Sequence, residues 1–134
     1  MATLIAHSNE ASTAAFAQHL ANTLGEQRGV TTAVTSLARA SRYVDTVEAV
    51  VVVAPAEDAA FHREARVFMA AHHAELANKS LFIAGLGTRP QPTKYQLQAM
   101  DAFGPRDTAY FRTDALDESA VSSWVNTINT RGAA

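Results

Sequence analysis

Short aliphatic runs alternate along the chain with longer stretches in which apolar residues recur every three or four positions. The aliphatic runs predict five β-strands, at residues 3–7, 30–37, 49–54, 80–84 and 108–112. The longer stretches predict amphipathic helices, which end at Gly25, cover residues 61–78 and 93–103, and begin again near Asp117. This alternation is typical of β-α-β units with right-handed crossovers. We therefore expect one α/β domain over residues 1–134, a three-layer sandwich around a five-stranded parallel sheet.

Two of the predicted strands differ in how much of their surface is covered. Residues 50–53 are four consecutive valines, which suit a strand that is buried on both faces. Residues 30–37 contain several threonines, so we expect this strand at an edge of the sheet. Pro55 is expected to end the third strand.

Composition and charge exclude several classes of function. The chain of 134 residues is 48% hydrophobic and 18% charged, with a formal net charge of −2, which excludes a disordered chain and affinity for nucleic acid or anionic lipid through bulk positive charge. The absence of cysteine excludes disulfides, thiolate catalysis and cysteine-bound metals. No apolar run is long enough to span a membrane and no basic leader precedes the first strand, so we expect a cytoplasmic protein.

In sheets of this kind, ligands bind beyond the carboxyl ends of the strands, so the loops at residues 8–12, 55–60 and 85–92 are the candidate site. In the first loop, Ser8, Asn9, Ser12 and Thr13 place hydroxyl and amide groups at a helix N-terminus, which favours an anion such as phosphate. The alternative is that Ser12 or Thr13 only caps the helix.

Two residues of this loop disfavour a phosphate. The Glu10 carboxylate, if it points inward at ~6 Å, would cost on the order of 5 kcal/mol beside a phosphate dianion, and about 1 kcal/mol if it points into water. Ala11 carries a Cβ that restricts the backbone and could crowd the phosphate. The orientation of Glu10 therefore decides between the two interpretations.

The five-strand pattern and the hydroxyl-rich first loop resemble the flavodoxins, whose first loop is a Ser/Thr-rich turn that holds the phosphate of FMN. Residues 7–13, followed by an alanine-rich helix, resemble the first loop of flavodoxin-type, menaquinone-dependent protoporphyrinogen dehydrogenases, which also carries an acidic residue where Glu10 stands. The stretch from Val50 to Leu76, with His62 at the helix start, is similar to that group as well. The resemblance implies the strand order 2-1-3-4-5, FMN as cofactor, and a redox partner protein or a quinone as partner.

The other two loops agree less well with a flavin site. The second loop offers Pro55, Ala56 and acidic residues including Glu57, so ring stacking would depend on Phe61, His62 or Tyr95. Residues 85–87, Gly-Leu-Gly, resemble the flavodoxin loop that wraps the edge of the flavin ring with backbone amides, but a plain turn explains them equally well. They lack the third glycine and the position of a dinucleotide fingerprint.

Two hypotheses follow. The first is an FMN-binding, flavodoxin-like electron-transfer protein or small oxidoreductase, in which the flavin does the redox chemistry and no metal takes part. The second is a flavodoxin-fold domain that has lost flavin and acts as an interaction or regulatory module, which Glu10, Ala11 and the ring-poor second loop favour. The flavin site of the first hypothesis comprises Ser8, Asn9, Glu10, Ala11, Ser12, Thr13, Pro55, Ala56, Glu57, His62, Gly85, Leu86, Gly87 and Tyr95.

Overall fold

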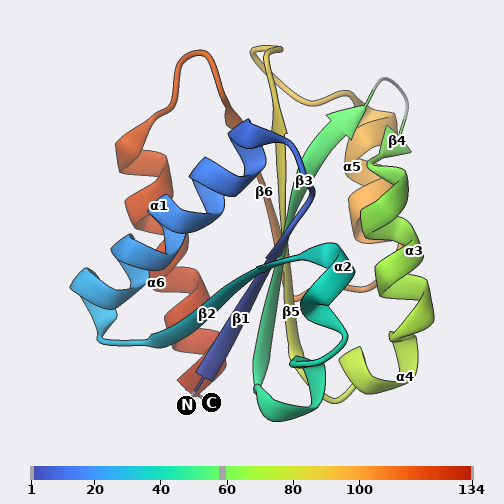
Figure 1. Cartoon of the computed structure of the whole chain (residues 1–134). Coiled ribbons are helices and arrows are strands. Elements are labelled where there is room, and N and C mark those ends of the chain that lie inside the picture. The colour runs from blue at the N-terminus through green and yellow to red at the C-terminus, as the bar shows by residue number, and fades with distance from the viewer. Residues whose placement is uncertain (1, 58–59, 134) are drawn as a thin grey trace.

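The computed structural model describes residues 2–57 and 60–133, and these form a sheet with helices on both faces (Figure 1). The parallel strands are β1 (Ala2–His7), β2 (Thr31–Ser36), β3 (Ala49–Glu57), β5 (Ser80–Gly87) and β6 (Asp107–Arg112). They lie in the order β2-β1-β3-β5-β6, and every neighbouring pair along this path is parallel. Counted as parallel strands alone, this is the predicted order 2-1-3-4-5, so the predicted fold class is confirmed.

The helices form the two outer layers of the sandwich. Helices α1 (Ala11–Arg28) and α6 (Glu118–Ala133) cover one face of the sheet. The other face carries α2 (Leu37–Ala40), the 3-10 turn η1 (Val44–Thr46), α3 (Arg63–Ala71), α4 (His73–Leu76) and α5 (Lys94–Asp101). Within the described residues, no helix is both long and apolar enough to cross a membrane.

The central strand β3 contributes to both hydrophobic cores. Successive side chains of a strand point to opposite faces, so Val50 and Val52 belong to the core beneath α3 and α5. Val51 and Val53 belong to the core beneath α1 and α6, and all four valines are fully buried. This burial on both faces is what the four consecutive valines predict. Strand β2 lies at the sheet edge, as expected from its threonines.

Two predicted helix boundaries are wrong. Helix α1 continues past Gly25 to Arg28, and its C-cap is Gly29, whose φ of 64° lies in the left-handed region that glycine adopts without strain. The predicted helix over residues 61–78 is two helices, α3 and α4, which are separated at His72 (φ −110°, ψ 20°).

Two strands extend further than predicted at the carboxyl edge of the sheet. Strand β3 continues through Pro55 to Glu57 and then pairs antiparallel with the short strand β4 (Ala60–Phe61). Proline fits there because β1 pairs with β3 only as far as Val53, so no neighbour on that side requires its amide. Gly85 and Gly87, which the aliphatic pattern leaves outside the predicted strand, belong to β5 because they pair with neighbouring strands.

Candidate functional site

The carboxyl ends of the parallel strands meet at one edge of the sheet, where three predicted loops also lie (Figure 1). Strand β1 ends at His7 and its connection leads directly into α1. Strand β3 ends at Glu57 in the β4 hairpin, and β5 ends at Gly87 before the segment that leads to α5. The edge therefore holds the candidate residues of all three loops.

Ser8 and Thr13 form a buried hydroxyl pair beneath the start of α1. Neither residue has any exposed surface, and their hydroxyl oxygens lie 2.9 Å apart. The Thr13 hydroxyl also lies within hydrogen-bond distance of two carbonyl oxygens, that of Ser8 at 2.9 Å and that of Glu10 at 3.0 Å. The amide of Ser8 donates to the carbonyl of Val53 (3.1 Å), which ties the loop to β3.

The Glu10 carboxylate turns back toward this hydroxyl pair. The Ser8 hydroxyl donates to it, and its second oxygen lies 3.5 Å from Nε2 of His62. The hydrogen bond from Ser8 lowers the pKa of Glu10 below its ordinary value, against the opposing effect of burial, and the Glu10 backbone and His62 lower it further. The side chain is 47% exposed, so one part contacts solvent while the other contacts the loop. The orientation left open by the sequence is therefore inward.

The start of α1 does not use a serine or threonine cap. Glu10 is the N-cap residue, with an extended backbone and no side-chain hydrogen bond to the first-turn amides. The prediction that Ser12 or Thr13 caps the helix is wrong, because both lie inside it. Asn9, Ala11 and Ser12 are exposed at this end of the helix. The first-turn amides of an 18-residue helix thus face the edge of the sheet, where an anion is favoured.

The second predicted loop is a hairpin. Pro55 and Ala56 are half-buried, Ala56 pairs with Phe61, and the backbone of Glu57 pairs with that of Ala60. Phe61 is 1% exposed and belongs to the core, so its ring is not available to a ligand. The side chain of Glu57 and all of Asp58 lie outside the described residues.

His62 lies directly after the hairpin, at the N-cap of α3. Its amide donates to the carbonyl of Pro55 (3.1 Å), and its side chain is 16% exposed. These contacts fix the ring beside the first loop. No local pattern predicts the contact between His62 and Glu10, since the two residues are far apart along the chain. The contact follows only from the topology, because the carboxyl ends of parallel strands lie at one edge of the sheet.

The Gly-Leu-Gly stretch packs against the chain's own side chains. A Cβ at Gly85 would lie 2.9 Å from Sδ of Met100, and a Cβ at Gly87 would overlap the hydroxyl of Tyr110. Leu86 is 2% exposed. In this structure both glycines are therefore required by close packing inside the sheet.

Tyr95 is an exposed ring at the same edge. It lies in the first turn of α5, whose N-cap Thr93 forms a capping box with Gln96. The ring is 56% exposed, and Nζ of Lys94 lies 5.5 Å from its centroid. The structure thus brings Ser8, Glu10, Thr13 and His62 into contact, whereas Tyr95 lies on α5, which packs against β4.

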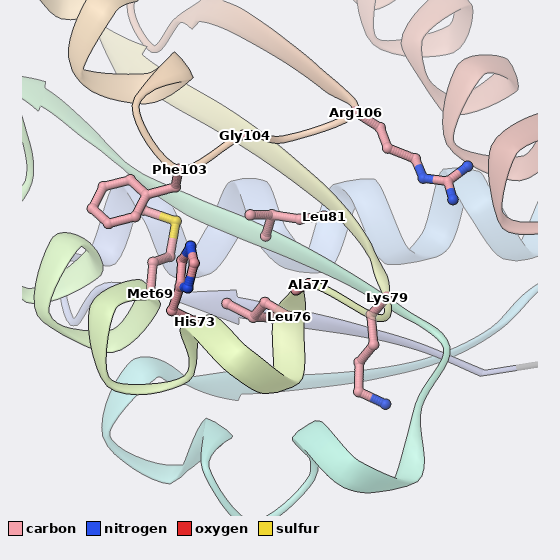
Figure 2. Close-up of a pocket in the computed structure, with 9 residues that line it drawn as sticks. All are labelled: Met69, His73, Leu76, Ala77, Lys79, Leu81, Phe103, Gly104 and Arg106. Carbon is pink, nitrogen blue, oxygen red and sulfur yellow. The ribbon is translucent and has the colours of Figure 1, made fainter.

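A cavity of about 350 Å³ lies at the opposite edge of the sheet, where β5 and β6 begin (Figure 2). Its apolar lining includes Met69, Leu81 and Phe103. Figure 2 shows the side chains of Lys79 and Arg106 extending away from these residues, and the Lys79 amine donates to the carbonyl of Val47 (2.7 Å). The cationic groups of Lys79 and Arg106 therefore do not point into this cavity, so its geometry does not favour an anionic ligand.

A serine, a histidine and a glutamate form a hydrogen-bonded chain between α2 and α4. Nε2 of His72 lies 2.9 Å from the Ser41 hydroxyl, and Nδ1 lies 3.0 Å from Glu75. Acyl transfer also needs amide donors for an oxyanion. The two amides after Ser41 donate instead to the carbonyls of Arg39 (3.2 Å) and Ala40 (2.9 Å). We therefore interpret these hydrogen bonds as a structural link between helices, with His72 partly buried and His73 exposed.

The sheet order defines a doubly wound α/β protein, and the loop after β1 carries the buried hydroxyl pair Ser8 and Thr13. The flavodoxin domain model matches residues 3–127, so the chain belongs to the flavodoxin family. No curated protein matches the chain.

Solved structures support the same fold. A short-chain flavodoxin associated with a non-canonical PDU bacterial microcompartment has a TM-score of 0.76 at 13% identity, covering 98% of this chain and 99% of that one. A flavodoxin from the domain Archaea has a TM-score of 0.71 at 14% identity, covering 100% of both chains. The apo form of an NADH:FMN oxidoreductase has a TM-score of 0.65 at 15% identity, covering 98% of this chain and 87% of that one.

Proposed function

We propose that this protein binds FMN and transfers electrons, either as a carrier or as a small oxidoreductase. The observation that carries the proposal is the buried hydroxyl pair, Ser8 and Thr13, at the start of α1 on the carboxyl edge of a flavodoxin-type sheet. Flavodoxins and an NADH:FMN oxidoreductase among the similar structures support it.

The donor set of the first loop fits the phosphate of FMN. The loop already holds one anionic oxygen, because the Ser8 hydroxyl donates to the Glu10 carboxylate. In the proposed complex, Ser8, Ser12 and Thr13, with Asn9 and the amides of Ala11 onward, would hold the phosphate instead. These groups are fixed by the strand β1 and by the hydrogen bond from the Ser8 amide to Val53.

The flavin ring would lie between the second and third segments of the edge. Pro55, Ala56, Glu57 and His62 would flank one side, and the backbone edge of residues 85–87 with the ring of Tyr95 would flank the other. FMN supplies one- and two-electron transfer when bound, and the protein has to bind it, orient it and limit its contact with water. Tyr95 is the exposed ring suited to stacking, since Phe61 is in the core.

A flavin titration tests the proposal. Purified protein mixed with FMN is expected to quench flavin fluorescence to a saturable end point, and to stay yellow after desalting. Tyr95→Ala is expected to weaken binding, and Tyr43→Ala, which removes another exposed tyrosine on a different part of the surface, serves as its control. Absence of both quenching and retained colour would contradict FMN binding.

A second candidate function is an interaction module without flavin. The inward Glu10 carboxylate favours it, because an ionised group already fills the space at the hydroxyl pair. The same titration separates the two candidates. If FMN is retained, oxidation of the reduced protein by a soluble quinone or by a protein acceptor would distinguish a quinone-linked role, as in the menaquinone-dependent protoporphyrinogen dehydrogenases, from protein-to-protein electron transfer.

A further inference from the structure

Glu10 occupies the position that an anionic ligand of the first loop would need. It is the N-cap residue of α1, so its carboxylate lies at the positive end of the helix dipole. Its first oxygen accepts the hydrogen bond from the buried Ser8 hydroxyl. A hydroxyl has one proton to donate, so this donor serves either Glu10 or a phosphate oxygen at any moment.

His62 holds the carboxylate in this place from the other side. Its Nε2 lies 3.5 Å from the second oxygen of Glu10, and its ring is largely buried. The ring is anchored to β3 by the hydrogen bond from the His62 amide to Pro55. Glu10 is thereby held between Ser8, which directly follows β1, and His62, the N-cap residue of α3.

We propose that Glu10 is an internal competitor for the phosphate of FMN and sets how strongly the chain discriminates between flavins with and without a phosphate. The inference rests on the proposed function. A bound phosphate requires the Glu10 side chain to leave Ser8 and turn to solvent. The side chain is 47% exposed, so this rotation needs no other residue to move. The remaining like charge beside the phosphate weakens binding of the phosphorylated flavin alone.

The test compares FMN, riboflavin and inorganic phosphate as ligands of three variants. Glu10→Gln removes the charge and keeps the shape, Glu10→Thr removes both, and Glu26→Gln removes an exposed carboxylate at the far end of the same helix as a control. We expect Glu10→Gln and Glu10→Thr to tighten FMN about tenfold or more, the change that removal of a like charge produces. Riboflavin affinity should change less than about twofold, and Glu26→Gln should match the wild type.

Each outcome supports or overturns the proposal. Equal tightening of FMN and riboflavin would show that Glu10 obstructs the ring, and an unchanged FMN affinity would show no competition; both overturn the inference and leave FMN binding intact. If no form binds either flavin, the proposed function fails and this inference fails with it. Where FMN binds, line broadening of inorganic phosphate in ³¹P NMR is a second readout of the inference. Broadening with Glu10→Thr but not with wild type supports it, and identical spectra overturn it. Circular dichroism of each variant checks that the fold is retained.

Discussion

The first loop and the Gly-Leu-Gly stretch lie at the same edge of the sheet and both resemble cofactor loops in sequence, but they are built differently. The first loop is a polar cluster in which Ser8, Thr13 and Glu10 contact one another. Gly85 and Gly87 belong to a strand, and the space beside each is filled by a side chain of the protein itself.

This difference shows what each residue type reveals. A buried hydroxyl needs a hydrogen-bond partner, and the hydroxyls beneath the start of α1 find theirs in each other, in nearby carbonyls and in the Glu10 carboxylate. Gly85 and Gly87 report only that another side chain lies close to the backbone. At Gly85 that neighbour is Met100, so the glycine needs no ligand to explain it.

The largest effect is expected when the buried network loses a hydroxyl. Thr13→Val keeps the shape of the side chain but removes the group that contacts the carbonyls of Ser8 and Glu10. We expect a loss of about 2 to 3 kcal/mol in the free energy of unfolding, because the Ser8 hydroxyl and the carbonyls of Ser8 and Glu10 each lose one hydrogen-bond partner in a buried site. Urea denaturation measures it.

Thr23→Val is the matched control for this prediction. Thr23 lies on the same helix and its hydroxyl donates only to the carbonyl of His19 (2.9 Å), one turn earlier. That bond competes with helical geometry and adds little, so a change below about 0.5 kcal/mol is expected. Similar losses for both variants would show that the first loop has no special network.

The next largest effect is expected at Gly85. A Cβ there would lie 2.9 Å from Sδ of Met100, which is fully buried and has little room to move. Gly85→Ala should therefore cost about 2 kcal/mol of stability through overpacking. The measurement is again urea denaturation, together with FMN affinity, which should stay within about twofold once the protein is folded.

Gly25→Ala is the control for a glycine without neighbours. No atom lies within 4 Å of the Cβ it would gain, and it is exposed inside α1, so the substitution should raise stability by about 1 kcal/mol. A stable Gly85→Ala protein that no longer binds FMN would reverse the comparison and assign Gly85 to the cofactor.

The sequence predicted the sheet well because burial leaves a strong pattern. The four valines of β3 and the threonines of β2 placed a central and an edge strand correctly, since side-chain period and polarity reflect which faces are covered. The ends of elements were predicted less well. Pro55 and Gly87 lie inside strands because their neighbours along the sheet tolerate or require them, and that information is not local.

The candidate site, like the fold, has a part that the sequence predicts and a part that it does not. Ser8 and Thr13 were identified from their position between a strand and a helix, which fixes where they meet. The direction of Glu10 depended on Ser8 and on His62, which lies on another segment, so no local pattern could decide it.

A smaller effect is expected at Gly87. The Cβ of Gly87→Ala would overlap the Tyr110 hydroxyl, which donates to the carbonyl of Arg89 (3.1 Å) on the exposed side. The tyrosine tip can shift, so we expect a cost of about 1 kcal/mol in thermal or urea denaturation. In a Tyr110→Phe background the same substitution should cost about half as much. An equal cost in both backgrounds would show that the strain lies elsewhere.

The smallest effect concerns pH and the Glu10 carboxylate. The Ser8 hydrogen bond lowers the folded-state pKa of Glu10 below its ordinary value of 4.5, so the contact stabilises the fold above that pH and is lost as pH falls through the lowered value. Wild type should exceed Glu10→Gln by less than about 1 kcal/mol near neutral pH, because a half-exposed carboxylate is screened by solvent. The gap should close as the pH drops below 4.5.

Urea denaturation of both proteins between neutral and acidic pH measures this gap, with Glu26→Gln as the control for loss of a carboxylate from α1. A gap that persists in acid would mean that the charge of the Glu10 carboxylate is not its source. In a separate measurement at neutral pH, addition of FMN is expected to raise the free energy of unfolding of Glu10→Gln more than that of wild type. The variant has no ionised group to displace from the hydroxyl pair. The first loop would then differ from the Gly-Leu-Gly stretch, because in this loop the Glu10 carboxylate and the ligand phosphate compete for the same hydrogen-bond donors.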